Sequence, residues 1–182
     1  MSVAIAVLAL VLCGGAAWIF NRLVRDRNQV KVAWSDVDVQ LQRRHDLVPP
    51  LVACVRAYAG HEHTVLTEAT QARSAALAPQ SLPAREDSEQ ALGRSLGHLM
   101  LLAESYPDLK ASANFSQLST QLVAVEDSLQ HARRFYNGSV RQYNTHLQRF
   151  PDLLVARALH FRAATFFAAE VQARANVQVV LE

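Results

Sequence analysis

His61, Glu62 and His63 stand next to one another and carry the imidazole and carboxylate groups that bind metal ions. Helical zinc sites, however, place their histidines four residues apart on one face of the helix. Residues two apart point about 200° away from each other, and the residue four after His61 is Val65, which cannot bind a metal. We therefore expect these side chains on a solvated surface and predict no metal site.

The sequence contains no complete set of residues for other kinds of catalytic chemistry. A di-iron centre in a helical bundle needs Glu-x-x-His motifs, and no glutamate here is followed by a histidine three residues later. Cys54 has no histidine at a neighbouring helical position, and no glycine-flanked nucleophile or phosphate-binding loop occurs among the 6 glycines. A Ser-His-Asp set assembled from distant segments stays open. We predict no enzyme, no catalytic residue and no cofactor.

Polar residues within or beside the apolar helical stripes are the remaining candidates for a site. Arg44, Glu62, Arg133 and Asn137 stand at such positions. Burying a charge is costly unless it is paired and hydrogen-bonded, so we expect an internal network that sets helix register, with Arg133 pairing with Glu62. The alternative is a pocket between helices that serves a membrane-bound hydrolase or binds a metal or another ligand.

An uncharged apolar stretch of 18 residues, Val3–Phe20, opens the chain. As a helix it would be ~27 Å long, close to the thickness of the hydrocarbon layer of a bilayer. Trp18 is followed by Arg22, Arg25 and Arg27, an order typical of a membrane interface. We predict one transmembrane helix within residues 1–22.

Two alternatives to an uncleaved anchor are disfavoured. A signal peptide has positive charges before its apolar run, whereas only Met1 and Ser2 precede this one. Lipid attachment at Cys13 is disfavoured by the bulky Leu12. Because the basic residues follow the stretch, we expect the N-terminus outside the cell and the remaining helices in the cytoplasm.

The rest of the chain predicts an all-α fold, in which three or four helices form an up-and-down antiparallel bundle over residues 23–169. The first should kink or restart near Leu47, before Pro49 and Pro50. A second should run to about Ala76, and a third from about Asp87 to Tyr106.

The longest predicted helix begins where Asn114 can cap it and ends before Pro151. Its apolar residues alternate by three and four over about five heptads, which is typical of coiled-coil packing. A short helix should follow from Leu153 to about Ala169, and residues 170–182 read as an extended tail.

Charge and cysteine content limit the partners. The formal net charge is +2, from 18 basic and 16 acidic residues, which argues against nucleic acid as a partner. Lysine occurs only at Lys31 and Lys110, and arginine is well suited to ion pairs between helices. Cys13 and Cys54 are too few for a disulfide framework or a cysteine-rich metal site.

Five segments together resemble one known family. The stretches "AWSDVDVQLQRRHDLVPPLV", "YAGHE", "YPDLKASANF", "ARRFYNGSVRQYN" and "FP" are similar, in this order, to segments of the LemA family of bacterial membrane proteins. The resemblance implies a single-pass inner-membrane protein with an outward N-terminus, a helical body and no assigned catalytic residue or cofactor. We therefore expect a membrane-anchored scaffold or interaction protein whose partners are the bilayer, other proteins, among them membrane proteins, or a second copy of itself.

Overall fold

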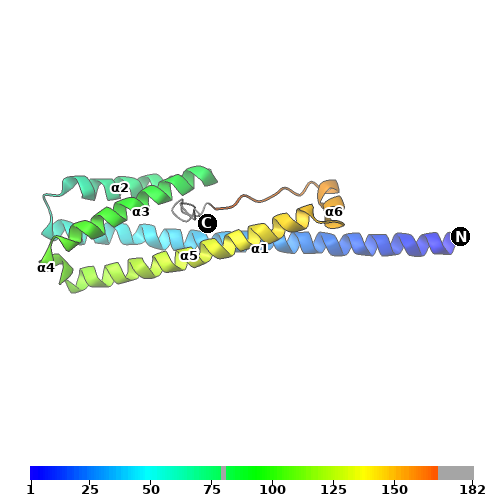
Figure 1. Cartoon of the computed structure of the whole chain (residues 1–182), viewed down its shortest axis with the longest axis horizontal. Coiled ribbons are helices and arrows are strands. Elements are labelled where there is room, and N and C mark those ends of the chain that lie inside the picture. The colour runs from blue at the N-terminus through cyan, green and yellow to red at the C-terminus, as the bar shows by residue number, and fades with distance from the viewer. Residues whose placement is uncertain (79–80, 168–182) are drawn as a thin grey trace, which may run out of the picture. The chain divides into compact units, whose positions relative to one another are not determined.

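Six α-helices make up the part of the chain that the computed structural model describes, residues 1–78 and 81–167 (Figure 1). These residues contain no β-strand, so the predicted all-α class is confirmed. The predicted tail, residues 170–182, lies outside the described residues. The helices are α1 (Ser2–Tyr58), α2 (His63–Leu77), α3 (Leu82–Glu104), α4 (Pro107–Lys110), α5 (Ala113–Gln148) and α6 (Asp152–Ala158).

The chain divides into two compact units, and the two longest helices, α1 and α5, contribute to both. Unit 1 contains Met1–Val37 and Ala132–Phe166. Unit 2 contains Asp38–His131 and, at the end of the described residues, Phe167. The apolar N-terminal stretch therefore continues as one helix into the folded part of the protein.

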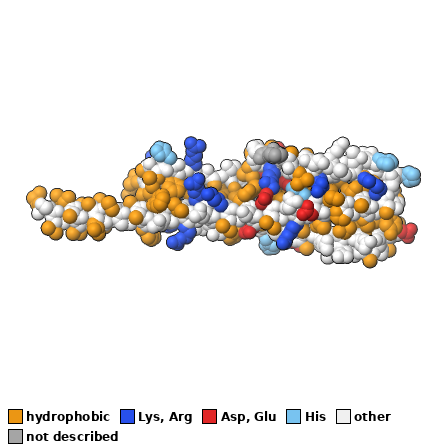
Figure 2. Space-filling view, turned by 180° about the vertical axis from the view of Figure 1, so that it is seen from behind, with side chains coloured by type: hydrophobic (Ala, Val, Ile, Leu, Met, Phe, Trp, Pro, Cys, Tyr) orange, Lys and Arg blue, Asp and Glu red, His pale blue; other side chains and the backbone are white. Residues whose placement is uncertain are grey.

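The first part of α1 is an apolar helix with exposed side chains. All residues up to Trp18 are exposed, and burial begins at Ile19. Among the described residues, α1 is the one helix that is long and apolar enough to span a membrane. The face visible in Figure 2 is mostly hydrophobic here and carries no charged side chain. Exposed apolar surface of this length matches the hydrocarbon layer of a bilayer.

Unit 1 is held together by an apolar seam between α1 and α5. Buried residues recur on α1 every three to four positions, at Ile19, Leu23, Asp26, Val30, Ala33 and Val37. The Trp34 ring meets the Tyr136 ring edge-on at 5.3 Å. The facing residues of α5 are Tyr136, Val140, Tyr143 and Leu147.

Unit 2 has its own apolar core. The part of α1 after Asp38 packs with α2, α3, α4 and the first half of α5 around one cluster of buried side chains. Its members follow the predicted three-four spacing, which confirms the helical-bundle packing. The fully buried members include Val48, Leu51, Val55, Leu92, Leu99 and Leu109.

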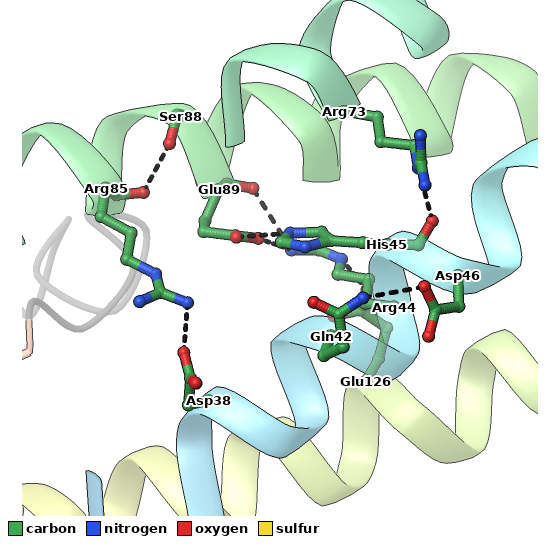
Figure 3. Close-up of polar contacts among 10 residues, drawn as sticks. All are labelled: Asp38, Gln42, Arg44, His45, Asp46, Arg73, Arg85, Ser88, Glu89 and Glu126. Atoms are coloured by element: carbon green, nitrogen blue, oxygen red, sulfur yellow. Dashed lines mark hydrogen bonds and ion pairs between the residues drawn. The ribbon is translucent and has the colours of Figure 1, made fainter. Parts of the chain in front are cut away.

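The predicted restart of the first helix near Leu47 is wrong, because α1 continues through both prolines to Tyr58. Proline at position 49 cannot donate a hydrogen bond to the carbonyl of His45, four residues earlier. That carbonyl instead accepts a hydrogen bond from Arg73 Nε at 2.8 Å (Figure 3). A side chain of α2 thus replaces the missing backbone donor, while both prolines lie on the exposed face of α1.

Two predicted helix ends also differ from the structure. Helix α3 begins at Leu82 rather than near Asp87, because Pro83 occupies its first turn, where a missing N–H has no cost. Helix α6 ends at Ala158, far short of Ala169. Residues 161–167 are not helical, and side chains of α5 bond to the backbone of this stretch at Ala164.

Candidate functional site

A cluster of buried charges joins three helices of unit 2 (Figure 3). We call Arg44, His45, Glu89 and Glu126 the buried charge cluster. His45 Nε2 lies 2.7 Å from Glu89 Oε1, and Arg44 Nη1 lies 3.4 Å from Glu89 Oε2 and donates to the Glu89 carbonyl at 3.2 Å. Arg44 Nε lies 2.6 Å from Glu126 Oε1. The Arg44 guanidinium therefore stands between a carboxylate of α3 and a carboxylate of α5.

Burial separates Arg44, His45 and Glu89 from solvent. The Glu89 side chain has 0% exposure and His45 has 2%, whereas Glu126 is 35% exposed. Such desolvated charges interact strongly with one another, but they need each other's hydrogen bonds to be tolerated. A substrate cannot reach Glu89 while the helices stay packed, so the arrangement is suited to holding α1, α3 and α5 in one register.

A glycine of α3 makes room for the Arg44 guanidinium. A Cβ atom at Gly93 would lie 2.9 Å from Arg44 Nη2, closer than side chains tolerate. Gly97, one turn further along α3, has open space around it. Since glycine weakens a helix interior by about 1 kcal/mol relative to alanine, its presence at position 93 is consistent with this steric need.

These two glycines give a matched prediction. Gly97→Ala should raise the free energy of unfolding of the full chain in mild detergent by about 0.5 to 1 kcal/mol, because alanine is the better helix former. Gly93→Ala should lower it by about 1 kcal/mol, because Arg44 is held on two sides and cannot withdraw from the new methyl group. Urea unfolding followed by circular dichroism measures both, and equal stabilisation by the two variants would contradict this steric role of Gly93.

Further polar contacts surround the cluster. Arg85 of α3 forms an ion pair with Asp38 of α1, and Gln42 donates to Asp46 at 2.9 Å along α1. Ser88 bonds to the Arg85 carbonyl at 2.9 Å. The Arg85–Asp38 pair is more exposed than the cluster, and exposed pairs of this kind contribute at most about 1 kcal/mol.

Two of the predicted network residues, Arg44 and Glu62, belong to unit 2, and the other two, Arg133 and Asn137, belong to unit 1. Arg44 is buried and paired, but its carboxylates are Glu89 and Glu126 rather than Glu62. Glu62 precedes α2 and accepts a 3.4 Å hydrogen bond from the Tyr106 hydroxyl.

The pKa of Tyr106 is raised, first by desolvation and then by the negative charge of Glu62. Arg133 and Asn137 belong to the α5 segment of unit 1, where both are partly buried and engaged in polar interactions. The expected Arg133–Glu62 pair joins residues of the two units and stays a prediction.

Sequence reasoning missed His45, Glu89 and Glu126, although two of them carried a signal. Glu89 stands three residues before Leu92 and so continues the apolar stripe of α3 backwards. His45 stands at a stripe position of α1, four residues after Leu41. Both residues could have been recognised as charged residues on a predicted buried face. Glu126 could not, because it lies beside the apolar stripe of α5 rather than in it.

A second set of polar contacts lies in unit 1, just after the apolar stretch. Asp26 is buried and contacts His146 Nδ1 at 2.6 Å and Gln142 Nε2 at 3.3 Å, both on α5. Arg22 forms an ion pair with the buried Asp152 at the start of α6. Burial raises the pKa of Tyr143, an effect that Arg27 opposes and Asp26 reinforces.

The predicted membrane-interface residues lie where the apolar stretch of α1 ends and these polar contacts begin. Trp18 is exposed and the Arg22 guanidinium lies 4.9 Å from the centre of its ring, a cation–π contact. Arg25 and Arg27 are exposed. In the part of the chain that the structure describes, no group of three or more histidine, cysteine or acidic side chains could hold a metal ion.

Comparison with known proteins identifies the family. The sequence profile of the LemA family matches residues 33–180. The chain belongs to the LemA family. It is 29% identical to Protein LemA of Metamycoplasma hominis over 160 residues, which cover 84% of this chain and 70% of the relative. It is 24% identical to Magnetosome protein MamQ 2 of Paramagnetospirillum magneticum and to Magnetosome protein MamQ of Magnetospirillum gryphiswaldense, over 81% of this chain.

The family match covers the helical body and not the apolar stretch. All four residues of the buried charge cluster lie within the matched residues, whereas Val3–Phe20 lies before them. The chain spans 64% of the length of the two magnetosome relatives. LemA-family membership and the apolar part of α1 together support a membrane-anchored helical protein.

Proposed function

We propose that this LemA-family chain is a single-pass membrane scaffold that presents a helical body to protein partners and has no catalytic activity of its own. The observation that carries the proposal is the continuity of α1, which runs from the apolar stretch to Tyr58 as one helix. A body joined to its anchor without a flexible linker is held near the bilayer surface. Confinement to a surface raises the effective concentration of the body toward other membrane-bound molecules.

Part of α5 in unit 2 offers a surface for a partner helix. Val123 is 62% exposed and borders a cavity of about 370 Å³ lined by small side chains of the same helix. Small side chains let a second helix approach closely, and an exposed valine gains by being covered. The other residues that line this cavity are Ser119, Thr120, Ala124 and Asp127.

Site-specific photo-crosslinking in cells tests the scaffold proposal. A photoreactive amino acid at Val123 should yield adducts to a membrane protein or to a second copy of the chain, and the same probe at the exposed Thr67 of α2 serves as control. Differently tagged copies expressed together separate self-association from binding of another protein. Equal labelling from both positions, or no protein adduct from Val123, would contradict the proposal.

The topology we infer places the N-terminus outside and the body in the cytoplasm, at the inner membrane of a bacterial cell. Its support is the position of Arg22, Arg25 and Arg27 after the apolar stretch, since basic flanks stay on the cytoplasmic side. The buried contacts of Arg22 with Asp152 show that one of these charges also serves the fold.

Maleimide labelling checks this topology. Ser81, exposed at the start of α3, is replaced by cysteine after Cys13 and Cys54 have been changed to alanine. A membrane-impermeant maleimide should leave intact cells unlabelled and react only after lysis. Labelling of intact cells, with a cytoplasmic marker protein still protected, would reverse the orientation.

A further inference from the structure

A cavity with basic side chains lies in unit 1 directly after the apolar stretch of α1. Its volume is about 510 Å³, within the range of ligand pockets. Helix α1 forms one side with Phe20, Val24, Arg27 and Lys31, and the other side comes from residues 159–162, which follow α6. Figure 2 shows Lys and Arg side chains gathered past the bare apolar helix, beyond a hydrophobic region that adjoins it.

Three cations converge on this cavity from two segments that are far apart in the sequence. Arg27 and Lys31 are one helical turn apart on α1, and Arg162 lies opposite. All three are exposed, and none of them forms an ion pair with another described residue. The nearby carboxylate of Asp26 is buried and bonded to His146 and Gln142. The lining is therefore positively charged.

Specific contacts fix the segment that carries Arg162. Tyr143 donates to the Arg162 carbonyl at 3.1 Å, and Asn144 makes two hydrogen bonds of 2.9 Å with the backbone of Ala164. The ring of Phe161 meets the Phe20 ring edge-on at 6.0 Å. The side of the cavity opposite α1 is thus held in place before any ligand binds, which lowers the entropic cost of binding.

The position of the cavity along α1 matches the headgroup layer of a bilayer. Phe20 ends the apolar stretch, and Arg27 and Lys31 follow at about 10 and 16 Å along the helix axis. The polar layer of a membrane extends roughly 5 to 8 Å beyond the hydrocarbon on each side, and the long side chain of Arg27 reaches back into it, while Lys31 lies at its outer edge. The apolar lining residues face the end of the acyl region, and the cations face the headgroups.

We propose that this cavity binds the phosphate of an anionic phospholipid headgroup from the membrane that holds α1. Arg27, Lys31 and Arg162 pair with the phosphate, and the acyl chains follow the exposed apolar face of residues 3–20. Basic pockets beside membrane helices bind anionic headgroups by the same charge pairing. The proposal rests on the membrane anchoring of the proposed function but not on its orientation or its protein partners.

Native mass spectrometry of the full chain in a mild non-ionic detergent tests the proposal. The probes are phosphatidylglycerol and phosphatidylcholine with identical acyl chains, added at equal concentration. One variant carries Arg27→Gln, Lys31→Gln and Arg162→Gln. In the control variant, glutamine replaces Arg141, Arg149 and Arg157. These three arginines are exposed in unit 1 and do not line the cavity.

The natural chain should retain phosphatidylglycerol at least about tenfold more strongly than phosphatidylcholine. Each cation near a membrane surface contributes about fivefold to the attraction of an anionic lipid, so the cavity variant should lose at least about tenfold. The control variant should lose less than about threefold, because its cations do not converge on one phosphate. Equal losses in the two variants, or no preference in the natural chain, would overturn the proposal.

Two further experiments test whether the bound phosphate belongs to a lipid and whether the chain is anchored in the membrane. Inorganic phosphate, added at constant ionic strength, should not displace the lipid, and displacement would overturn the assignment to a lipid. Carbonate washing of membranes should leave the natural chain and both variants in the pellet. Release of the natural chain would overturn membrane anchoring itself, whereas a retained variant that no longer prefers phosphatidylglycerol supports the role of the cavity.

Discussion

Replacing Glu89 with glutamine should lower the free energy of unfolding of the full chain by about 3 kcal/mol or more. Glutamine keeps the shape of the side chain but removes the charge that Arg44 and His45 face in a fully buried setting. Removing one member of a buried pair leaves an uncompensated charge behind, which costs more than the net contribution of the intact pair. Urea unfolding in mild detergent, followed by far-UV circular dichroism, measures the loss.

The matched control is Glu126→Gln, which removes the other carboxylate that contacts Arg44. Because Glu126 is 35% exposed, water screens this interaction and the loss should stay near about 1 kcal/mol. A double-mutant cycle with Arg44→Met then measures the coupling between Arg44 and Glu89, which we expect to exceed about 1 kcal/mol. A Glu89→Gln chain as stable as the natural one would show that the cluster does not hold the helices together.

Leu99→Ala should lower the free energy of unfolding by about 2 to 5 kcal/mol, because it removes buried methyl groups and leaves a cavity in the core of unit 2. Leu99 is 0% exposed on α3, whereas Leu101 on the same helix is 65% exposed. Leu101→Ala, the same chemical change at an exposed position, should shift the stability by less than about 0.5 kcal/mol. The same urea titrations compare the two variants.

Similar losses for both leucines would contradict the assigned packing of α3. In that case the helix would present a different face to the core, and the contacts of Glu89 on the same helix would need to be redrawn. A large effect at Leu99 with a small one at Leu101 supports the face of α3 from which the buried charge cluster is built.

The scaffold proposal and the lipid proposal use different helices of the chain. The lipid proposal concerns the exposed apolar stretch and the basic cavity of unit 1, while the α5 surface around Val123 belongs to unit 2. Lipid binding beside the anchor would add contacts at the bilayer surface without using the partner surface. The two experiments therefore succeed or fail separately.

Some features followed from the sequence because they depend on local periodicity and composition. The uncharged run Val3–Phe20 predicted the apolar helix, and the three-four spacing of residues such as Leu92, Leu96 and Leu99 predicted the buried face of α3. Five segments in a fixed order predicted the LemA family, which the family profile confirms. A helix determines its own buried face, because its backbone geometry places every third or fourth residue on one side.

The partners of the polar residues were decided by the tertiary structure. Arg44 was singled out as an interrupting charge, but its pairing with Glu89, 45 residues away, depends on which faces of α1 and α3 meet. The passage of α1 through Pro49 depends on Arg73, a donor from another helix. The basic cavity depends on a non-helical segment that α5 holds beside α1. The spacing of residues in the sequence predicts which face of its own helix a residue occupies. These contacts join groups from different segments, and only the packing of the chain determines the distance between them.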